Sequence, residues 1–230
     1  MNTKFIFSFL LIFSLSLTFG QELALVQESK LFGYIDKSGE YVIKPQFEKA
    51  ASFSQKYAAA AKDKKWGFIN TLGEWAIQPE YDLVSAFNSG YALVKKGDLW
   101  TYIDGSGKVL ETPVPDKYYD FTDGAALFKK GEKIGLLGTD GKLILEPTYD
   151  EIKPFDGNYT KAKQGELWGL IDNKGKVFVP IEYQEIGHYN KHGIWAKKGD
   201  AFGVISNGVF KPIANVDKIW DFTDGSDLTY

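Results

Sequence analysis

The chain has 230 residues, and its 27 basic and 30 acidic side chains give a formal net charge of −3 at pH 7. All the basic residues are lysines, so the chain lacks the arginine that reads phosphate and guanine through paired hydrogen bonds, which argues against a nucleic-acid partner. It also lacks cysteine, which excludes disulfides and lipid attachment through a thiol.

The N-terminal segment has the features of a secretory signal peptide. Lys4 precedes an apolar run over residues 5–17, and small residues follow up to Gly20, as at a signal-peptidase cleavage site. A membrane anchor is the alternative, but the apolar stretch over residues 5–19 is only 15 residues long, whereas a spanning helix needs about 20. We therefore expect residues 1–20 to be cleaved.

The remaining residues, 21–230, are predicted to form one exported domain without a transmembrane segment, located in the periplasm, at the cell surface or in the medium. Six units recur through this domain at a spacing of 34 residues, which is typical of repeat architectures. Their anchors are Phe32-Gly33, Trp66-Gly67, Trp100-Thr101, Ile134-Gly135, Trp168-Gly169 and Phe202-Gly203.

Each unit begins with two predicted strands. In the second unit, the first strand covers residues 57–62 and the second covers residues 66–70, and the polar pair Asp63-Lys64 forms a tight turn between them. The next turn has an Asx side chain at Asn70 and a glycine that accepts positive φ at Gly73. This chemistry predicts an antiparallel hairpin followed by a second turn.

A third strand and a return loop complete the unit. The third strand, residues 41–43 in the first unit, is expected to stop at Pro45, because proline cannot donate a ladder hydrogen bond and so either terminates pairing or lies at a sheet edge. The loop carries two aromatic residues, Phe47 and Phe53 in this unit, which we expect to lie beneath the sheet. Such a three-stranded meander is marginal alone, so neighbouring units must cover its faces.

The repeated tryptophan is predicted to pack between consecutive units, and the glycine after it to let a neighbouring backbone or ring approach closely. Small residues on the first strand, such as Ala58 and Ala60, would receive the bulk of the indole. Thr101 replaces the glycine in the third unit, and Ile134 replaces the tryptophan in the fourth. Both replacements favour a packing role over ligand binding.

These units resemble those of the WG-repeat (KWG) proteins found in bacteria. The resemblance rests on residues 65–70 (KWGFIN) followed by Gly73, on residues 167–172 (LWGLID) followed by Gly175, and on PTYD at residues 147–150. It covers nearly the whole predicted domain, and the third unit departs from it most. The resemblance implies an all-β, propeller-like module that mediates interactions and has no established catalytic residues.

Two architectures fit six 34-residue, three-stranded antiparallel repeats, namely a propeller-like ring and an open β-solenoid-like array. The domain starts with a predicted strand at residues 23–27 and ends just after residues 221–225, which repeat the DFTDG of residues 120–124. This phasing would let the first strand meet the C-terminal end and close a ring, which removes exposed edges. The open array remains the alternative, because propeller blades normally have four strands.

No catalytic motif and no cofactor-binding motif is recognisable, so neither enzyme activity nor a cofactor is predicted. The two histidines of the chain, His188 and His192, could join Glu185 in binding zinc. A paired-histidine site usually lies on a helix, whereas this segment is expected to be a loop. We therefore predict no metal site and expect both histidines to face solvent.

Five aromatic side chains outside the repeated positions are the candidates for ligand contact: Trp75, Trp195, Trp220, Tyr118 and Tyr119. Exposed together, they could stack on sugar rings or anchor a partner. The sequence thus favours a non-catalytic exported scaffold that binds an unidentified protein, peptide or glycan. The alternatives are a structural envelope component without an exposed aromatic patch, and a hydrolase whose carboxylates converge from different units.

Overall fold

The computed structural model describes residues 22–191 and 193–223, so the predicted signal peptide lies outside the described residues. Within these ranges the regular structure consists of 21 β-strands and no helix. It follows that the described chain has no helix of the length and apolarity required to cross a membrane.

The strands form six antiparallel sheets, one for each repeat. The first contains β1 (Ala24–Glu28), β2 (Leu31–Ile35) and β3 (Tyr41–Phe47); the second contains β4 (Lys49–Ala50), β5 (Ala58–Lys62), β6 (Lys65–Ile69) and β7 (Trp75–Tyr81). The third contains β8 (Leu83–Val84), β9 (Tyr91–Lys96) and β10 (Leu99–Asp104); the fourth contains β11 (Ala125–Lys130), β12 (Lys133–Gly138) and β13 (Leu143–Tyr149). The fifth contains β14 (Glu151–Ile152), β15 (Tyr159–Gln164), β16 (Leu167–Asp172) and β17 (Val177–Tyr183); the sixth contains β18 (Glu185–Ile186), β19 (Ile194–Lys198), β20 (Ala201–Ser206) and β21 (Val209–Pro212).

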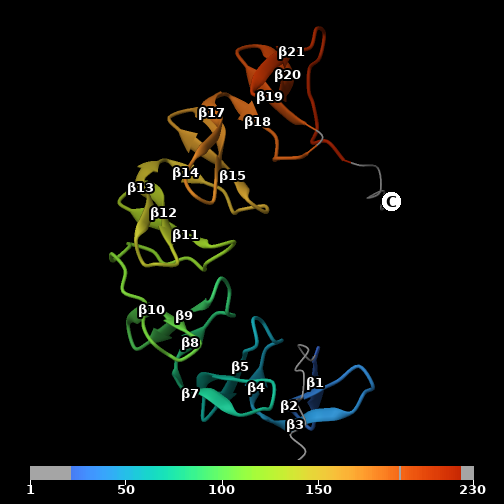
Figure 1. The fold of residues 1–230 in the computed structure, drawn as a ribbon, viewed down its shortest axis with the longest axis vertical. Helices are drawn as coiled ribbons and strands as arrows, with labels where there is room; N and C mark the ends of the chain where they lie inside the picture. The colour runs from blue at the N-terminus through green and yellow to red at the C-terminus, as the bar shows by residue number, and fades with distance from the viewer. Residues whose placement is uncertain (1–21, 192, 224–230) are drawn as a thin grey trace, which may run out of the picture.

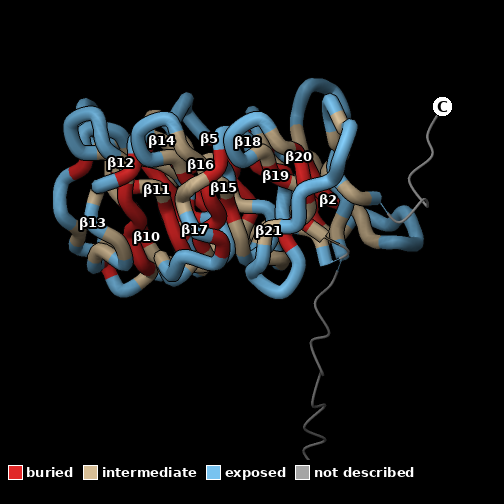
Figure 2. The backbone as a smooth tube through the Cα atoms, turned by 90° about the horizontal axis from the view of Figure 1, so that it is seen from above, coloured by how far each residue is buried: buried red, intermediate tan, exposed pale blue. Residues whose placement is uncertain are grey.

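The six sheets follow one another along an open arc, with the first and sixth sheets at its two ends (Figure 1). This arrangement confirms the predicted all-β, propeller-like class built from tandem antiparallel repeats. The expected ring closure does not form within the described residues, because β1 pairs only with β2 and no strand of the first sheet joins the sixth. Buried backbone runs through the middle of the arc, and exposed loops line both of its edges (Figure 2).

The core consists of five clusters of buried side chains, one at each junction between consecutive sheets. At the first junction, Tyr34 and Phe47 of the first sheet pack on Ala58 and Ala60 of the second. Large side chains of one sheet therefore meet small side chains of the next, as predicted, and this matching allows close packing between the layers.

The tryptophans lie at the rims of these junctions. Trp66, Trp100 and Trp168 are half-buried and pack against the edges of their clusters. The large side chain that fills each junction belongs instead to the second strand, two residues after the tryptophan position of the repeat. Tyr34 and Phe68 occupy this place and are almost fully buried. The predicted packing role of the tryptophan is thus confirmed, but the expectation that the indole supplies the bulk facing the small residues is wrong.

The third strand continues past its proline in the first, second, fourth and fifth sheets, contrary to our prediction, whereas β21 of the sixth sheet ends at Pro212 as predicted. β7 continues past Pro79 to Tyr81, which pairs with Trp66 across a bulge. Proline is tolerated because β7 is the edge strand of its sheet. The first of the two aromatic residues predicted for the return loop, such as Tyr81, is therefore a strand residue, and it is buried.

The bulge explains the glycine of the Trp-Gly pair. A Cβ atom on Gly67 would lie 2.5 Å from the Ile77 carbonyl oxygen and 2.7 Å from the Pro79 nitrogen. The predicted close approach of a backbone is confirmed, and that backbone belongs to the third strand of the same sheet. In the third sheet, where Thr101 replaces the glycine, no third strand forms, and only the isolated bridge between Ile103 and Val109 remains.

The second aromatic of each loop packs back on the preceding sheet at most junctions. Phe53 contacts Tyr34, Phe87 contacts Phe68, and Phe121 contacts Tyr102, with ring centroids 4.7–4.8 Å apart. These contacts confirm that the loop aromatics lie beneath the sheets. The fifth unit is the exception, because its loop aromatic is exposed.

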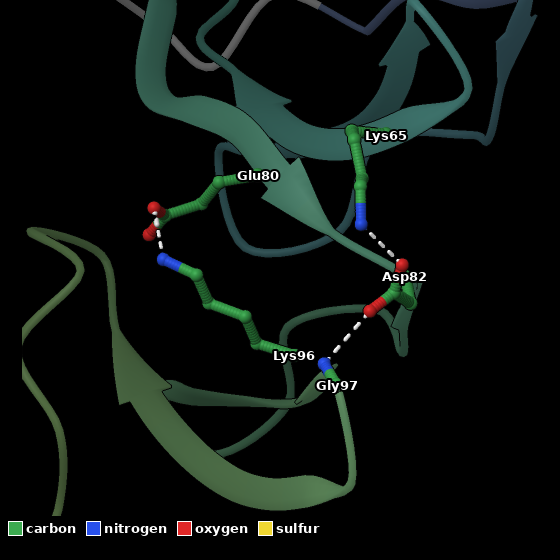
Figure 3. A network of polar contacts seen from close by, with 5 residues as sticks. All are labelled: Lys65, Glu80, Asp82, Lys96 and Gly97. Atoms are coloured by element: carbon green, nitrogen blue, oxygen red, sulfur yellow. Dashed lines mark hydrogen bonds and ion pairs between the residues drawn. The ribbon is translucent and has the colours of Figure 1, made fainter.

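Polar contacts join the sheets outside the apolar clusters. Asp82, at the end of the second sheet, contacts the Lys65 ammonium and accepts a hydrogen bond of 2.8 Å from the Gly97 N–H in the turn of the third sheet (Figure 3). Glu80 and Lys96 form an ion pair of 2.6 Å beside it. Asp150 contacts the Gly165 N–H in the same way at 2.7 Å. We call this repeated contact the turn clamp.

Candidate functional site

The five aromatic residues predicted to contact a ligand do not form one surface. Trp75 packs edge-on against Phe47 at the first junction, with ring centroids 5.6 Å apart. Tyr118 packs on Tyr102 at the third junction, and the backbone oxygen of Tyr119 accepts a hydrogen bond of 2.5 Å from the Tyr102 hydroxyl. These three residues therefore support the fold.

The other two candidates lie near the C-terminal end of the arc. Trp220 is 71% exposed, with the Lys218 ammonium 5.1 Å from the centre of its ring. Trp195 is half-buried on β19, and its indole N–H donates a hydrogen bond of 2.7 Å to Asp221. Trp195 also lines a groove, described below, and it is the predicted residue with the strongest structural case.

A groove of about 560 Å³ lies between the fifth and sixth sheets. Its apolar lining includes Val179, Ile194 and Ile205, and its polar lining includes Ser206 and Asn207 in the last hairpin turn. We call it the aromatic groove, because three aromatic rings gather along its side.

These rings belong to Tyr159, Phe178 and Tyr189. The Tyr159 ring lies 4.6 Å from Phe178 and 4.2 Å from Tyr189, measured between centroids. Phe178 is 46% exposed and Tyr189 is 38% exposed, and both line the groove. Three rings that contact one another and remain open to solvent form an apolar surface suited to stacking against a ligand.

A second, smaller groove of about 250 Å³ lies at the same junction. Trp168 and Trp195 line it together with Ile186, and Lys153, Lys161, Gln184 and Glu185 supply its polar groups. We call it the indole–lysine groove. The two grooves give the fifth junction both an open aromatic surface and a charged recess.

Lys161 is the ammonium group most constrained by this recess. Its Nζ lies 3.3 Å from His188 Nε2, and burial lowers the pKa of its ammonium. Asp221 accepts hydrogen bonds from the Trp195 indole at 2.7 Å and from the His188 backbone N–H at 3.0 Å. Asp221 of the C-terminal segment thereby fixes the orientation of the Trp195 ring, which forms one wall of the indole–lysine groove.

The carboxylates of the described chain serve turns and ion pairs. Asp36 and Asp104, for example, accept hydrogen bonds from backbone N–H groups of their own turns, and contacts with the neighbouring serines lower the pKa of both carboxyls. No three His, Cys, Asp or Glu side chains are grouped for metal binding within residues 22–191 and 193–223. His192, considered as a zinc ligand, lies outside the described residues.

Sequence reasoning missed most of this site. Tyr189 occupies the second aromatic position of the loop, where the repeat predicts packing beneath the sheet, and Tyr159 lies at the start of a predicted first strand. Nothing in the pattern distinguishes Phe178. Lys161 had a detectable signal, because it occupies a position of the first strand that is apolar in the other five units. The residues at that position are Leu25, Ala59, Leu93, Leu127 and Trp195.

A family model described as the WG containing repeat matches five consecutive segments of the chain. The matched segments are residues 32–66, 66–100, 100–133, 134–168 and 168–200. Their boundaries fall at the anchors of the 34-residue repeat, and together they cover most of the chain. No curated protein is significantly similar to it.

Solved structures with a related arrangement have low sequence identity to this chain. A eukaryotic initiation factor aligns with a TM-score of 0.46 and 12% identity, over 84% of this chain and 62% of that one. Kluyveromyces lactis Hsv2 aligns with a TM-score of 0.42 and 11% identity, over 80% of this chain and 69% of that one. K. marxianus Hsv2 aligns with a TM-score of 0.45 and 10% identity, over 80% of this chain and 68% of that one. This chain thus spans about two thirds of the length of each.

Proposed function

Because this chain belongs to the WG containing repeat family, we propose that it is an exported, non-catalytic scaffold that binds a glycan or peptide at the junction of its fifth and sixth sheets. The repeats supply a row of sheets held together by buried clusters, and the ligand occupies the aromatic groove. Export is supported by the signal-peptide pattern of residues 1–20.

The exposed aromatic rings carry this proposal. Aromatic rings are usually buried in a repeat core, yet Phe178 and Tyr189 keep much of their surface in solvent beside the aromatic groove. The negative face of an aromatic ring attracts the C–H groups of a sugar ring or of a peptide side chain. A volume of about 560 Å³ also lies within the range of about 300–1,000 Å³ found for small-ligand sites.

The electrostatics of the carboxylates support a non-catalytic role. Among the described carboxyl groups, each pKa that departs from its ordinary value is lowered, as at Asp82, Asp150 and Glu182, chiefly through hydrogen bonds from lysines. A general acid in glycoside hydrolysis needs a raised pKa so that it can hold its proton near neutral pH. These carboxylates are instead held in the ionised form.

Binding by paired aromatic variants tests the proposal. The purified protein is screened on glycan and peptide arrays, and hits are titrated by calorimetry. Phe178→Ala combined with Tyr189→Ala should weaken binding by about tenfold or more, because truncating aromatic anchors removes most of the contact energy. Tyr41→Ala is the control, since Tyr41 is 46% exposed on the first sheet. Equal affinities for the two variants and the wild type would reject the groove as the binding site.

A further inference from the structure

Lys161 interrupts an apolar position of the repeat. The corresponding residues in the preceding three units face the next sheet, as Ala59 does at the second junction and Leu93 at the third. Lys161 thus brings a charged group to the junction between the fifth and sixth sheets, where its counterparts bring apolar side chains. Because a charge at a packing position costs desolvation energy, it needs a compensating partner.

No carboxylate among the described residues forms a direct ion pair with Lys161, and the Asp221 carboxylate attracts its ammonium only from a longer distance. The Lys161 ammonium contacts a ring nitrogen of His188 and forms no ion pair within residues 22–191 and 193–223. The nearby carboxylates are engaged elsewhere, since Glu151 pairs with Lys153 and Glu185 lies 3.8 Å from the Lys197 ammonium. Asp221 accepts hydrogen bonds from the Trp195 indole and the His188 backbone.

The walls of the groove are suited to contact with the face of a ring. The side chains of Trp168 and Trp195 both line the recess, and Ile186 adds an apolar surface between the sheets. Because the indole N–H of Trp195 is bonded to Asp221, this ring is held in place. A volume of about 250 Å³ falls below the range for drug-sized ligands, which indicates a single ring or residue as the occupant.

From this combination of indoles and an ammonium without a direct ion pair, we propose that the indole–lysine groove binds a carboxylate-bearing sugar ring, such as a uronic acid. The indoles contact the C–H groups of the pyranose, and Lys161 pairs with its carboxylate. A single ammonium suits one carboxylate, whereas a phosphate would favour the forked arginine that this chain lacks. The inference goes beyond the proposed function, because it assigns a ligand class to the second groove at the same junction.

A matched pair of ligands tests the charge requirement. A short oligogalacturonate and its methyl ester have the same rings and differ in the carboxylate, and each is titrated into the purified protein at low salt. The wild type should bind the acid about tenfold more tightly than the ester, as expected for a charge-assisted hydrogen bond. Lys161→Met should abolish this preference, and Lys161→Arg should retain it.

Lys174→Met is the control, since it removes the same charge from an exposed hairpin turn. Equal binding of acid and ester by the wild type, binding of neither, or an equal loss in Lys174→Met would overturn the inference. Competition by poly-glutamate as strong as that by the uronate would assign the groove to acidic peptides instead. The two proposals can fail separately. If the acid and the ester bind alike, this inference fails. The proposed function still stands in that case, provided that the double variant Phe178→Ala and Tyr189→Ala weakens binding of an array-selected ligand.

Discussion

The glycine after the tryptophan shows how one residue controls a strand. Gly67 is required for space, because any Cβ would overlap the bulged backbone around Pro79. The sequence predicts a close approach at this position from the pairing of a large residue with glycine. It could not show which backbone approaches, because the bulge forms only when β7 pairs with β6 beyond the proline.

Gly67→Ala should therefore lower the free energy of unfolding by about 1–3 kcal/mol, the usual cost of an overpacked position. Thr101→Ala is the matched control at the same repeat position, where no third strand lies opposite. Its effect should stay within the range of about 1 kcal/mol that β-propensity alone explains. Urea denaturation measures both, and equal losses for the two variants would contradict this explanation of the glycine.

At the scale of elements, the first two strands of each sheet follow directly from the sequence. Their alternating apolar residues and glycine-containing turns place β5 and β6 within one residue of the predicted ranges. The short strands such as β4 were not predicted, because two residues carry no periodic signal and pair only when the next sheet is in position. The extension of the third strands past proline was missed for the same reason, since it depends on their place at the sheet edge.

The turn clamps between consecutive sheets make the stability of the fold depend on pH. The hydrogen bond from Lys65, followed by that from the Gly97 N–H, lowers the pKa of Asp82 below its ordinary value of 3.8. Contacts with Lys133 and the Gly165 N–H do the same for Asp150. A carboxyl with a lowered folded-state pKa stabilises the fold above its unfolded pKa, and this contribution disappears as the pH falls through the folded pKa.

The thermal midpoint should accordingly change little between pH 7 and about pH 5 and fall as the pH drops below about 4. Asp82→Asn combined with Asp150→Asn should lower the midpoint at pH 7 and make the decline in acid shallower, since two of the titrating clamps are gone. Scanning calorimetry across this range measures both effects. A double variant with the wild-type acid profile would show that the clamps do not contribute.

At the scale of the whole molecule, each sheet packs mainly on its neighbours, so one junction can acquire ligand-binding residues without disturbing the others. The repeat itself was predictable, because its period is uninterrupted. The aromatic groove was not, because Tyr159 and Phe178 come from two strands of the fifth sheet and Tyr189 reaches them from the loop of the sixth, and no repeat pattern brings these three positions together. Lys161 could have been identified by comparing the six units position by position.

The central claim is that ligand binding is confined to this fifth junction. Hydrogen–deuterium exchange of the protein, with and without a saturating array-selected ligand, tests it most directly. We predict slower exchange in residues 177–191 and 194–208, which line the aromatic groove, and unchanged exchange in the first three sheets, residues 24–104. Protection confined to the first three sheets, with none at the fifth junction, would contradict it.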